Sequence, residues 1–240
     1  MSAIAKKRIL TEMKTLVSSP PDADGIYIKF NQDNIFKIYA MILSSKDTPY
    51  THGYWFFEIT IGPNYPFEPP VFKFRTLNSN VRFNPNLYTD GKVCLSVINT
   101  WSGDGWKPEM TICSVLRCIQ SMVLIENPLI NEPGYTNKTN YEEHKYKFSD
   151  YIAHVTYAKF VTGILEMLIS TPTEFEDFIP VMQKYYIDNY DKIMQELTEF
   201  DEANGSLMSF PTTVYDKSIN RDIDLRSSFT ALYESLKYIL

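Results

Sequence analysis

Four short segments rich in Ile, Tyr and Phe constrain the fold of this chain more than any other feature of its sequence. They cover residues 25–30, 35–43, 54–61 and 71–74. β-branched and aromatic residues favour strands, and the short polar connections between the first three favour antiparallel pairing of neighbours. The sequence therefore predicts a four-stranded antiparallel sheet.

Helical periodicity is found on both sides of this sheet. Residues 2–16 place apolar residues on one face and lysines around the other, and apolar residues recur at steps of three and four from Ile112 onward. Residues 76–110 follow no period, and an irregular stretch of that length in a compact domain is usually functional. The order of elements predicts an α+β domain. Helices are expected over residues 112–127, about 141–168, 171–204 and about 228–240.

The sequence divides into a first unit over residues 1–168 and a helical extension over residues 169–240. Just after the boundary, Thr171-Pro172-Thr173-Glu174 has the form of a capping box with proline at the first helical position. The extension is acidic, with thirteen acidic and six basic residues from position 170 onward. Its apolar stripe predicts packing against the preceding helix.

Charge and cysteine content argue against several classes of protein. The formal net charge of −6 is not that of a general nucleic-acid binder, and no apolar run approaches the roughly 18 residues of a membrane span. The N-terminal segment lacks the apolar stretch of a signal peptide, and three cysteines are too few for a disulfide framework. We therefore expect a soluble protein of the cytoplasm, the nucleus or both.

Cys94 is the candidate nucleophile. Cys113 and Cys118 lie beside apolar helical positions, where burial is expected, and the scattered histidines and missing C-x-x-C pair argue against a metal site. Cys94 lies in the irregular stretch, where it is either accessible and reactive or tucked under the loop. Asn86, eight residues earlier, could donate to an oxyanion formed at an acyl group on the cysteine, or could merely belong to an Asn-Pro-Asn turn.

The segment Tyr65-Pro66-Phe67-Glu68-Pro69-Pro70 predicts a rigid turn between two strands, because proline fixes φ and donates no backbone hydrogen bond. An exposed Phe67 on such a turn would be a good anchor for a partner. A plain strand connector is the alternative.

Together these segments resemble the ubiquitin-conjugating (E2) enzyme family over roughly residues 3–168. The proline-rich turn is similar to the family's Y-P-F-x-P-P, Asn84-Pro85-Asn86 to its H-P-N, and Gly91-Lys92-Val93-Cys94-Leu95 to its active-cysteine segment. Trp106-Lys107-Pro108 and Asn127-Pro128 resemble the motifs that flank its first core helix. The Asn-Pro-Asn form resembles the long E2 subgroup that includes the FAT10-conjugating enzyme.

This resemblance implies a UBC-like fold, with an E2 catalytic core over residues 1–168 and an acidic helical extension over residues 169–240. Cys94 would accept ubiquitin, or a ubiquitin-like protein, from an E1 enzyme as a thioester and pass it to a substrate lysine or an E3 cysteine. Asn86 would stabilise the oxyanion, and Glu132 or Asn131 would orient or desolvate the incoming amine. The resemblance implies no bound cofactor, because the E1 consumes the ATP.

The resemblance also implies surfaces for partners. An acidic E1 surface would bind the basic first helix through Lys6, Lys7, Arg8 and Lys14; a solvated helix face is the alternative. An E3 ligase would contact Phe67 and Pro108. The extension could recruit substrate or select the modifier instead of only packing.

Two other classes of protein stay open at this point. A non-catalytic E2-like module would hold ubiquitin or scaffold a partner, but such variants lack the cysteine found here at position 94. A cysteine hydrolase would need a general base near Cys94, and no histidine lies nearby in the sequence.

Overall fold

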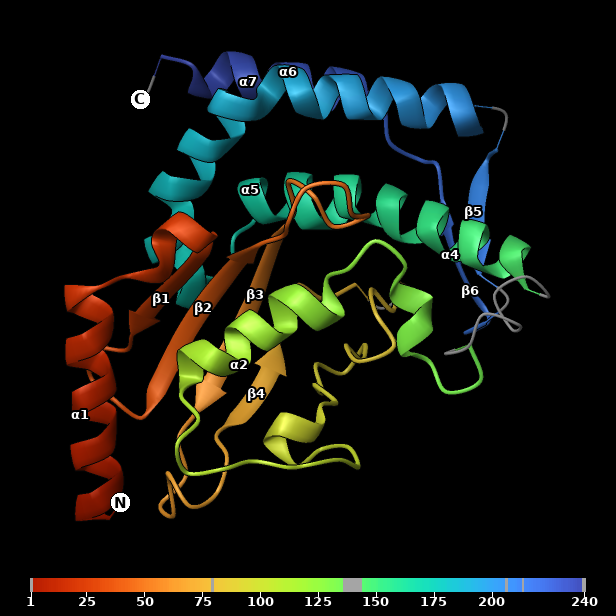
Figure 1. The fold of residues 1–240 in the computed structure, drawn as a ribbon. Helices are drawn as coiled ribbons and strands as arrows, with labels where there is room; N and C mark the ends of the chain where they lie inside the picture. Colours follow the sequence, from red (N-terminus) through yellow and green to blue (C-terminus); the bar gives the residue numbers. More distant parts are fainter. Residues whose placement is uncertain (1, 79, 136–143, 206, 213, 239–240) are drawn as a thin grey trace.

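The four predicted segments form one antiparallel sheet in the order β1-β2-β3-β4 (Figure 1). The structure is a computed structural model that describes residues 2–78, 80–135, 144–205, 207–212 and 214–238. The strands are β1 (Ile26–Phe30), β2 (Lys37–Leu43), β3 (Tyr54–Thr60) and β4 (Val71–Phe74). Nearly every side chain of β2 and β3 is buried. Because side chains alternate between the two faces of a strand, both faces of the sheet must be covered.

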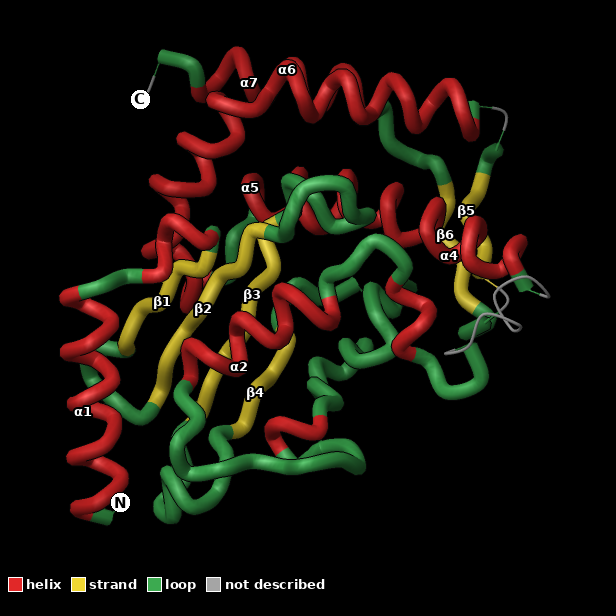
Figure 2. The backbone as a smooth tube through the Cα atoms, viewed as in Figure 1, coloured by secondary structure: helices red, strands yellow, loops and turns green. Residues whose placement is uncertain are grey.

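Helices precede and follow the sheet as predicted (Figure 2). Helix α1 (Ala3–Ser18) begins at Ser2, whose hydroxyl accepts a hydrogen bond from the Ala5 amide. Helix α2 (Ile112–Cys118) begins with a capping box and continues as a π-helical turn over Ile119–Val123. The helix therefore ends before the predicted residue 127. Met122, predicted on the apolar face, is 62% exposed, since a π turn shifts the helical register.

The next helical run is α4 (Lys145–Ala158), a π-helical segment (Lys159–Glu166) and α5 (Met167–Ile169). The predicted first residues of this helix, 141–143, lie outside the described residues. By length and composition the run could cross a membrane, contrary to the expectation from the sequence, with a mean hydropathy of 1.3 in its most apolar window. However, 67% of that window is buried inside the protein, which is typical of a core helix.

A glycine lets this helical run approach the sheet. At Gly163 an added Cβ would lie 3.1 Å from the ring of Trp55. The Trp55 ring is fully buried and packs edge-on against Tyr50 and Phe83, at centroid distances of 5.3 and 5.1 Å. Close packing of this kind leaves little room for an extra methyl group, so Gly163 fixes the spacing between helix and sheet.

The extension differs from its predicted form in three respects, the first being the helix bounds: its long α-helix begins at Ile179 and not at residue 171, and its last helix begins at Leu225 and not at residue 228. It contains a 3-10 helix (Thr173–Phe178), α6 (Ile179–Asn204) and α7 (Leu225–Leu236), but also an unpredicted hairpin of β5 (Ser209–Thr212) and β6 (Lys217–Asn220). The predicted capping box is wrong: the Thr171 hydroxyl donates back to the Met167 carbonyl, and Glu174 pairs with Arg75.

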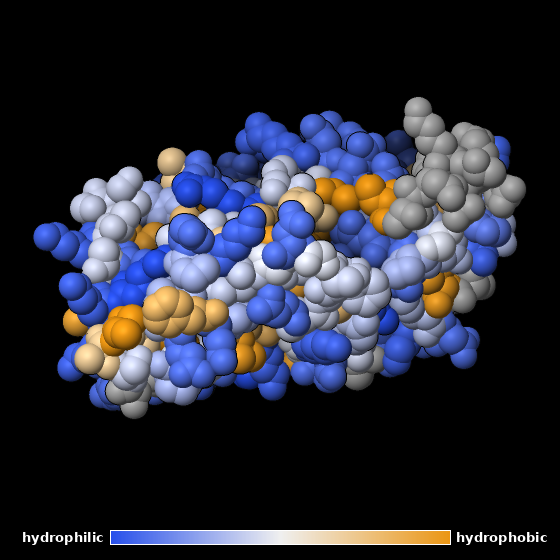
Figure 3. All heavy atoms as spheres, turned by 60° about the horizontal axis from the view of Figure 1, so that its bottom comes forward, coloured by the Kyte–Doolittle hydropathy of each residue, from blue (hydrophilic) through white to orange (hydrophobic). Residues whose placement is uncertain are grey.

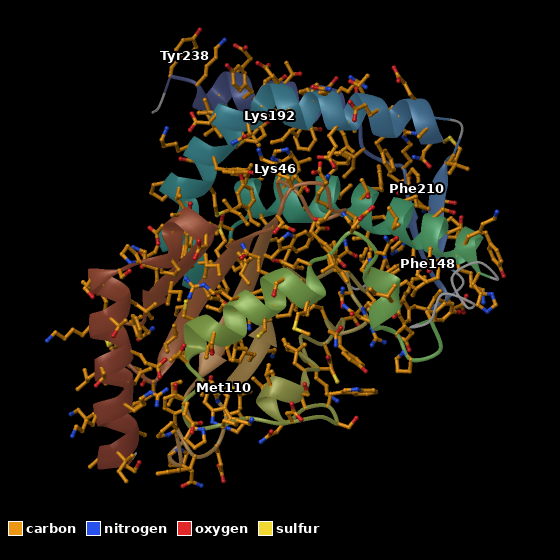
Figure 4. The ribbon with its side chains drawn as sticks, in the orientation of Figure 1. Lys46, Met110, Phe148, Lys192, Phe210 and Tyr238 are labelled. Carbon is orange, nitrogen blue, oxygen red and sulfur yellow. The ribbon has the colours of Figure 1, made fainter. Side chains whose placement is uncertain are left out.

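The extension shares one hydrophobic core with the first unit. Phe175 stacks on Phe56 of β3 at 4.5 Å, and the Tyr54 hydroxyl donates to the Met182 carbonyl at 2.9 Å. Phe210 of β5 lies beside α4 (Figure 4), where it stacks on Tyr157 at 4.6 Å. The predicted boundary at residue 168 thus falls inside a continuous packed interior.

Candidate active site

A small hairpin-like loop brings Asn86 and Cys94 together. The Cys94 amide donates to the Asn86 carbonyl at 2.9 Å, and Leu87 bridges to Val93. The loop turns at Gly91, which has φ +89°, and an added Cβ there would lie 2.8 Å from the Phe74 carbonyl oxygen. Glycine is therefore required at the turn, and the eight-residue spacing follows from the loop.

Asn84 braces this loop from inside the protein. Its fully buried side chain donates to the Val123 carbonyl at 2.7 Å and to the Tyr50 hydroxyl at 3.0 Å. Its amide oxygen accepts from the Asn86 backbone at 2.8 Å. Burial raises the pKa of Tyr50, so its hydroxyl stays protonated and donates to the Phe83 carbonyl at 2.6 Å. An amide thus connects the loop to the helix after α2.

The Cys94 thiol is nearly buried and donates to the Thr100 carbonyl at 3.1 Å. It nevertheless lines a cavity of about 130 Å³, so the cysteine is covered by its loop and still faces a cavity. No histidine among the described residues lines this cavity. A Cys–His pair of the hydrolase type is therefore absent from the described part of the site.

All four residues predicted to be catalytic line this one cavity, which we call the Cys94 pocket: Asn86, Cys94, Asn131 and Glu132. The Asn86 amide donates to the Cys94 carbonyl at 2.6 Å. The Asn131 amide donates to the Met122 carbonyl at 2.9 Å, whereas Glu132 turns a carboxylate oxygen toward the Tyr215 hydroxyl, 2.6 Å away. Their proximity is an observation, and their catalytic roles stay predictions.

Residues that the sequence did not single out complete the pocket. The Arg82 guanidinium lies 3.8 Å from the ring centre of Tyr88 and 4.6 Å from that of Tyr215. Trp101, 53% exposed, lines the pocket from the loop after Cys94. A tryptophan seven residues after the cysteine, in the same irregular stretch, was a usable signal. Tyr215 does not line the pocket but contacts Arg82 and Glu132, which do. No signal in the sequence indicated it, because it follows Glu132 by 83 residues.

The predicted partner residues on α1 are placed in two ways. Lys6, Lys7 and Lys14 are exposed. The Arg8 guanidinium instead donates to the carbonyls of Pro108 and Met110, at 2.8 and 2.6 Å. Arg8 therefore attaches the helix to the loop before α2.

Phe67 and Pro108 lie on turns that are joined to each other. Phe67 is 65% exposed, and Pro108 is exposed as well. The Trp106 indole donates to the Pro66 carbonyl at 2.6 Å, which holds the two turns together. The face of the molecule in Figure 3 is mostly hydrophilic and carries small, separate apolar patches.

Among the described residues, no group of three His, Cys, Asp or Glu side chains could hold a metal ion.

Cys113 and Cys118 are half-buried and not fully buried as predicted. Burial raises the pKa of the Cys113 thiol, which favours its unreactive protonated form.

Comparison with known proteins decides the family. The family model for "Ubiquitin-conjugating enzyme" matches residues 8–157. The chain belongs to the ubiquitin-conjugating enzyme family. It is similar to "Ubiquitin-conjugating enzyme E2 Z" of Danio rerio (38% identity) and of Homo sapiens (37%), in both cases over 77% of this chain, and over 54% and 50% of those proteins. It also matches the human "Dual E2 ubiquitin-conjugating enzyme/E3 ubiquitin-protein ligase BIRC6" at 30% identity, over 83% of this chain and 4% of that protein.

The E2 family match explains the observed architecture: a first helix, a four-stranded antiparallel sheet and helices after it form a UBC fold. The chain spans about half the length of its E2 Z relatives. The matched residues 8–157 contain Cys94 and Glu132 but not Tyr215.

Proposed function

We propose that this E2 accepts the C-terminal acyl group of ubiquitin, or of a ubiquitin-like protein, on Cys94 and transfers it to a substrate lysine or an E3 cysteine. The observation that carries the proposal is the Cys94 pocket, where a thiol, an amide donor and a carboxylate converge. The loop that holds the thiol is fixed by backbone bonds and by Asn84, as expected for a preorganised site.

The charging step is an exchange of thioesters. The Cys94 thiol, which now donates to the Thr100 carbonyl, loses its proton to solvent, and the thiolate attacks the carbonyl carbon of the E1-bound thioester. The new C–S bond to Cys94 forms, the C–S bond to the E1 breaks, and the E1 thiolate leaves. No bound cofactor takes part, and the E1 consumes the ATP.

The transfer step is aminolysis of the new thioester. A neutral lysine amine attacks the acyl carbon, its extra proton passes to solvent, the C–N bond forms, and Cys94 leaves as a thiolate. We assign stabilisation of the oxyanion to the Asn86 amide and orientation of the amine to Glu132. The Asn86 amide lines the Cys94 pocket; it donates one hydrogen to the backbone carbonyl of Cys94 at 2.6 Å and has a second N–H for the oxyanion. One amide donor of this kind is worth about 3–4 kcal/mol in a transition state.

Partner surfaces follow the same proposal. The exposed Lys6, Lys7 and Lys14 form the basic face that we assign to the E1, and Phe67 with Pro108 form the contact that we assign to an E3. The E1 contact should weaken as salt rises, which the rate of charging at two salt concentrations measures. E3-dependent transfer should fall in Phe67→Ala while E1 charging does not. We place the reaction in the cytoplasm or nucleus, which imaging of a tagged chain tests.

The deciding experiment is a non-reducing gel of the chain with E1, ATP and ubiquitin, beside Cys94→Ala and a lane with dithiothreitol. A shifted band that needs ATP and Cys94 and disappears with reductant supports the proposal. If ubiquitin gives no band, the same gel with FAT10-like modifiers and a second E1 follows. Failure with every modifier would favour the alternative, a non-catalytic E2-like ubiquitin-binding or scaffold module.

A second arm of this experiment isolates the transfer step. Asn86→Ala should charge as the wild type does and should discharge onto lysine about 100- to 1,000-fold more slowly. Equal loss in both steps would contradict the role assigned to Asn86.

A further inference from the structure

We propose that Tyr215, in the turn of the C-terminal hairpin, is a positioning residue for the lysine-transfer step, because it holds the Glu132 carboxylate at the Cys94 pocket. This inference rests on the function proposed above and assigns the extension a part in that reaction. The contact joins residues 83 positions apart and lies outside the matched family segment, residues 8–157.

The hydrogen bond itself has a fixed direction. The Tyr215 hydroxyl donates to Oε2 of Glu132 at 2.6 Å. Burial and the adjacent carboxylate both raise the pKa of Tyr215, so the hydroxyl keeps its proton at neutral pH. A hydrogen bond from a neutral donor to a carboxylate is shorter and stronger than one between neutral groups. It fixes the position of one carboxylate oxygen. Because the carboxylate is a rigid planar group, this also restricts the position of the other oxygen.

Contacts other than the hydrogen bond to Glu132 also hold Tyr215 in place. Its ring packs edge-on against Tyr151 of α4 at 5.7 Å. The hairpin that carries it is attached to α4 a second time, where the Phe210 carbonyl lies 2.6 Å from Nδ1 of His154. Packing on α4 therefore holds the Tyr215 ring, and we infer that its hydroxyl orients the Glu132 carboxylate.

A second path leads from the same ring to the loop of Asn86. The Arg82 guanidinium lies over the rings of both Tyr215 and Tyr88 and donates to the Pro85 carbonyl at 2.6 Å. Such stacking of a guanidinium on aromatic rings is favourable. The Tyr215 hydroxyl thus orients Glu132, while its ring contacts the guanidinium that donates to the Asn-Pro-Asn turn.

These two functions can be separated by two substitutions. Tyr215→Phe removes the hydroxyl and keeps the ring, so it should affect only the step that needs the carboxylate. Tyr215→Ala removes both and should also disturb the loop of Asn86. Tyr186→Phe is the matched control, since it removes another buried tyrosine hydroxyl of the extension, one that donates to the Phe229 carbonyl at 2.7 Å.

The experiment follows the preformed thioester in single turnover, with free lysine or with a small thiol as acceptor. In Tyr215→Phe, charging and transfer to the thiol should equal those of the wild type, because no amine takes part. For transfer to lysine, the maximal rate divided by the half-saturating lysine concentration should be about tenfold lower than in the wild type. In Tyr186→Phe, every rate should stay at the wild-type value. Loss of transfer to both acceptors in Tyr215→Phe would overturn the inference, since a structural defect would not distinguish lysine from thiol.

A double-mutant comparison tests the route through Glu132. If Tyr215 acts through the carboxylate, Tyr215→Phe should have no further effect in a Glu132→Gln background. Independent, multiplying losses would overturn the inference. If Tyr215→Phe charges normally and transfers to lysine at the wild-type rate, the inference is overturned while the proposed function is not. Failure of the wild-type chain to charge with any modifier would overturn the proposed function and the inference together.

Discussion

The two ends of this chain are attached to the E2 core by the same chemical pair, a tyrosine hydroxyl and a glutamate, with different results. On α1, the Glu12 carboxylate accepts from Tyr65, from Nε of Arg8 and from the Ile112 amide. At the other end, Glu132 accepts from Tyr215.

The two carboxylates differ in how many hydrogen bonds their oxygens accept. Glu12 is 6% exposed and has donors on both oxygens, so it can hold elements together and can do nothing else. Glu132 is half-buried at the wall of the Cys94 pocket, and the described residues give it one donor, on Oε2. A carboxylate with an oxygen that accepts no hydrogen bond from the described residues still has acceptor capacity for another group at the pocket.

Removing the whole C-terminal attachment should have the largest effect. A chain that ends at Leu168 would expose Phe56 and would leave the fully buried Lys159 ammonium without Glu196, now 2.5 Å away. Exposing one apolar side chain of this size to water costs about 1.5–3 kcal/mol. We expect this truncation to aggregate, as measured by the soluble fraction and size-exclusion chromatography. A soluble, cooperatively folded product would show that the extension is a separate unit.

The next effect tests the N-terminal pair. Glu12→Gln should lower the free energy of unfolding by about 3 kcal/mol, because its amide would face three donors. Glu132→Gln should lower it by less than about 1 kcal/mol. Urea denaturation of both variants measures the difference, and thioester discharge onto lysine should give the reverse order. Similar stability losses in both would remove the distinction drawn between the two carboxylates.

A pH effect should appear at the C-terminal attachment. Burial, with the charges of Lys159, Lys192 and Lys46, lowers the pKa of His52 to about 4. The unfolded chain, with a histidine pKa of about 6.5, then takes up the proton first as the pH falls. Stability should therefore decrease by about 2 kcal/mol between about pH 7.5 and about pH 5.

His52→Asn should abolish this part of the pH dependence. Asparagine tolerates the positive φ of 68° at this position, so the backbone should not change. Urea midpoints of both proteins at the two pH values provide the measurement. If the substitution leaves the pH dependence of stability unchanged, the His52 side chain, whose Nδ1 lies 3.0 Å from the Tyr185 hydroxyl, is not the source of that dependence.

The smallest expected effect on stability comes from a direct comparison of Tyr65 and Tyr215. Tyr65→Phe should lower the free energy of unfolding by about 1–2 kcal/mol, since it removes one donor to a buried carboxylate. It should leave lysine transfer unchanged, whereas Tyr215→Phe should slow that transfer. Thermal melts and the single-turnover assay on the same two proteins make the comparison. Slower lysine transfer in Tyr65→Phe would mean that both pairs influence the pocket.

Local sequence patterns predicted most of the fold and the central part of the site. The four strands are contiguous segments joined by short connections, and Asn86 with Cys94 belong to one small loop. Such features depend on neighbours in sequence, so a single chain carries the information. The family resemblance added Glu132 and Asn131, and both line the pocket.

Features that depend on distant parts of the chain were not predicted. Strands β5 and β6 have four residues each, and β5 contains Pro211, a residue that usually argues against a strand. Arg8 looked like part of a basic docking face, yet its guanidinium donates to carbonyls about a hundred residues away. Tertiary packing determines such contacts, and no local period reports them.

The distance along the chain between Glu132 and Tyr215 has a consequence for biosynthesis. Ribosomes extend chains at about 5–20 residues per second, so Tyr215 is made about 4–17 s after Glu132, given the 83 residues between them. During that interval the nascent core already contains Cys94 and Asn86, but the carboxylate beside them has no tyrosine hydroxyl. The pocket thus acquires its final geometry only when synthesis has passed the hairpin.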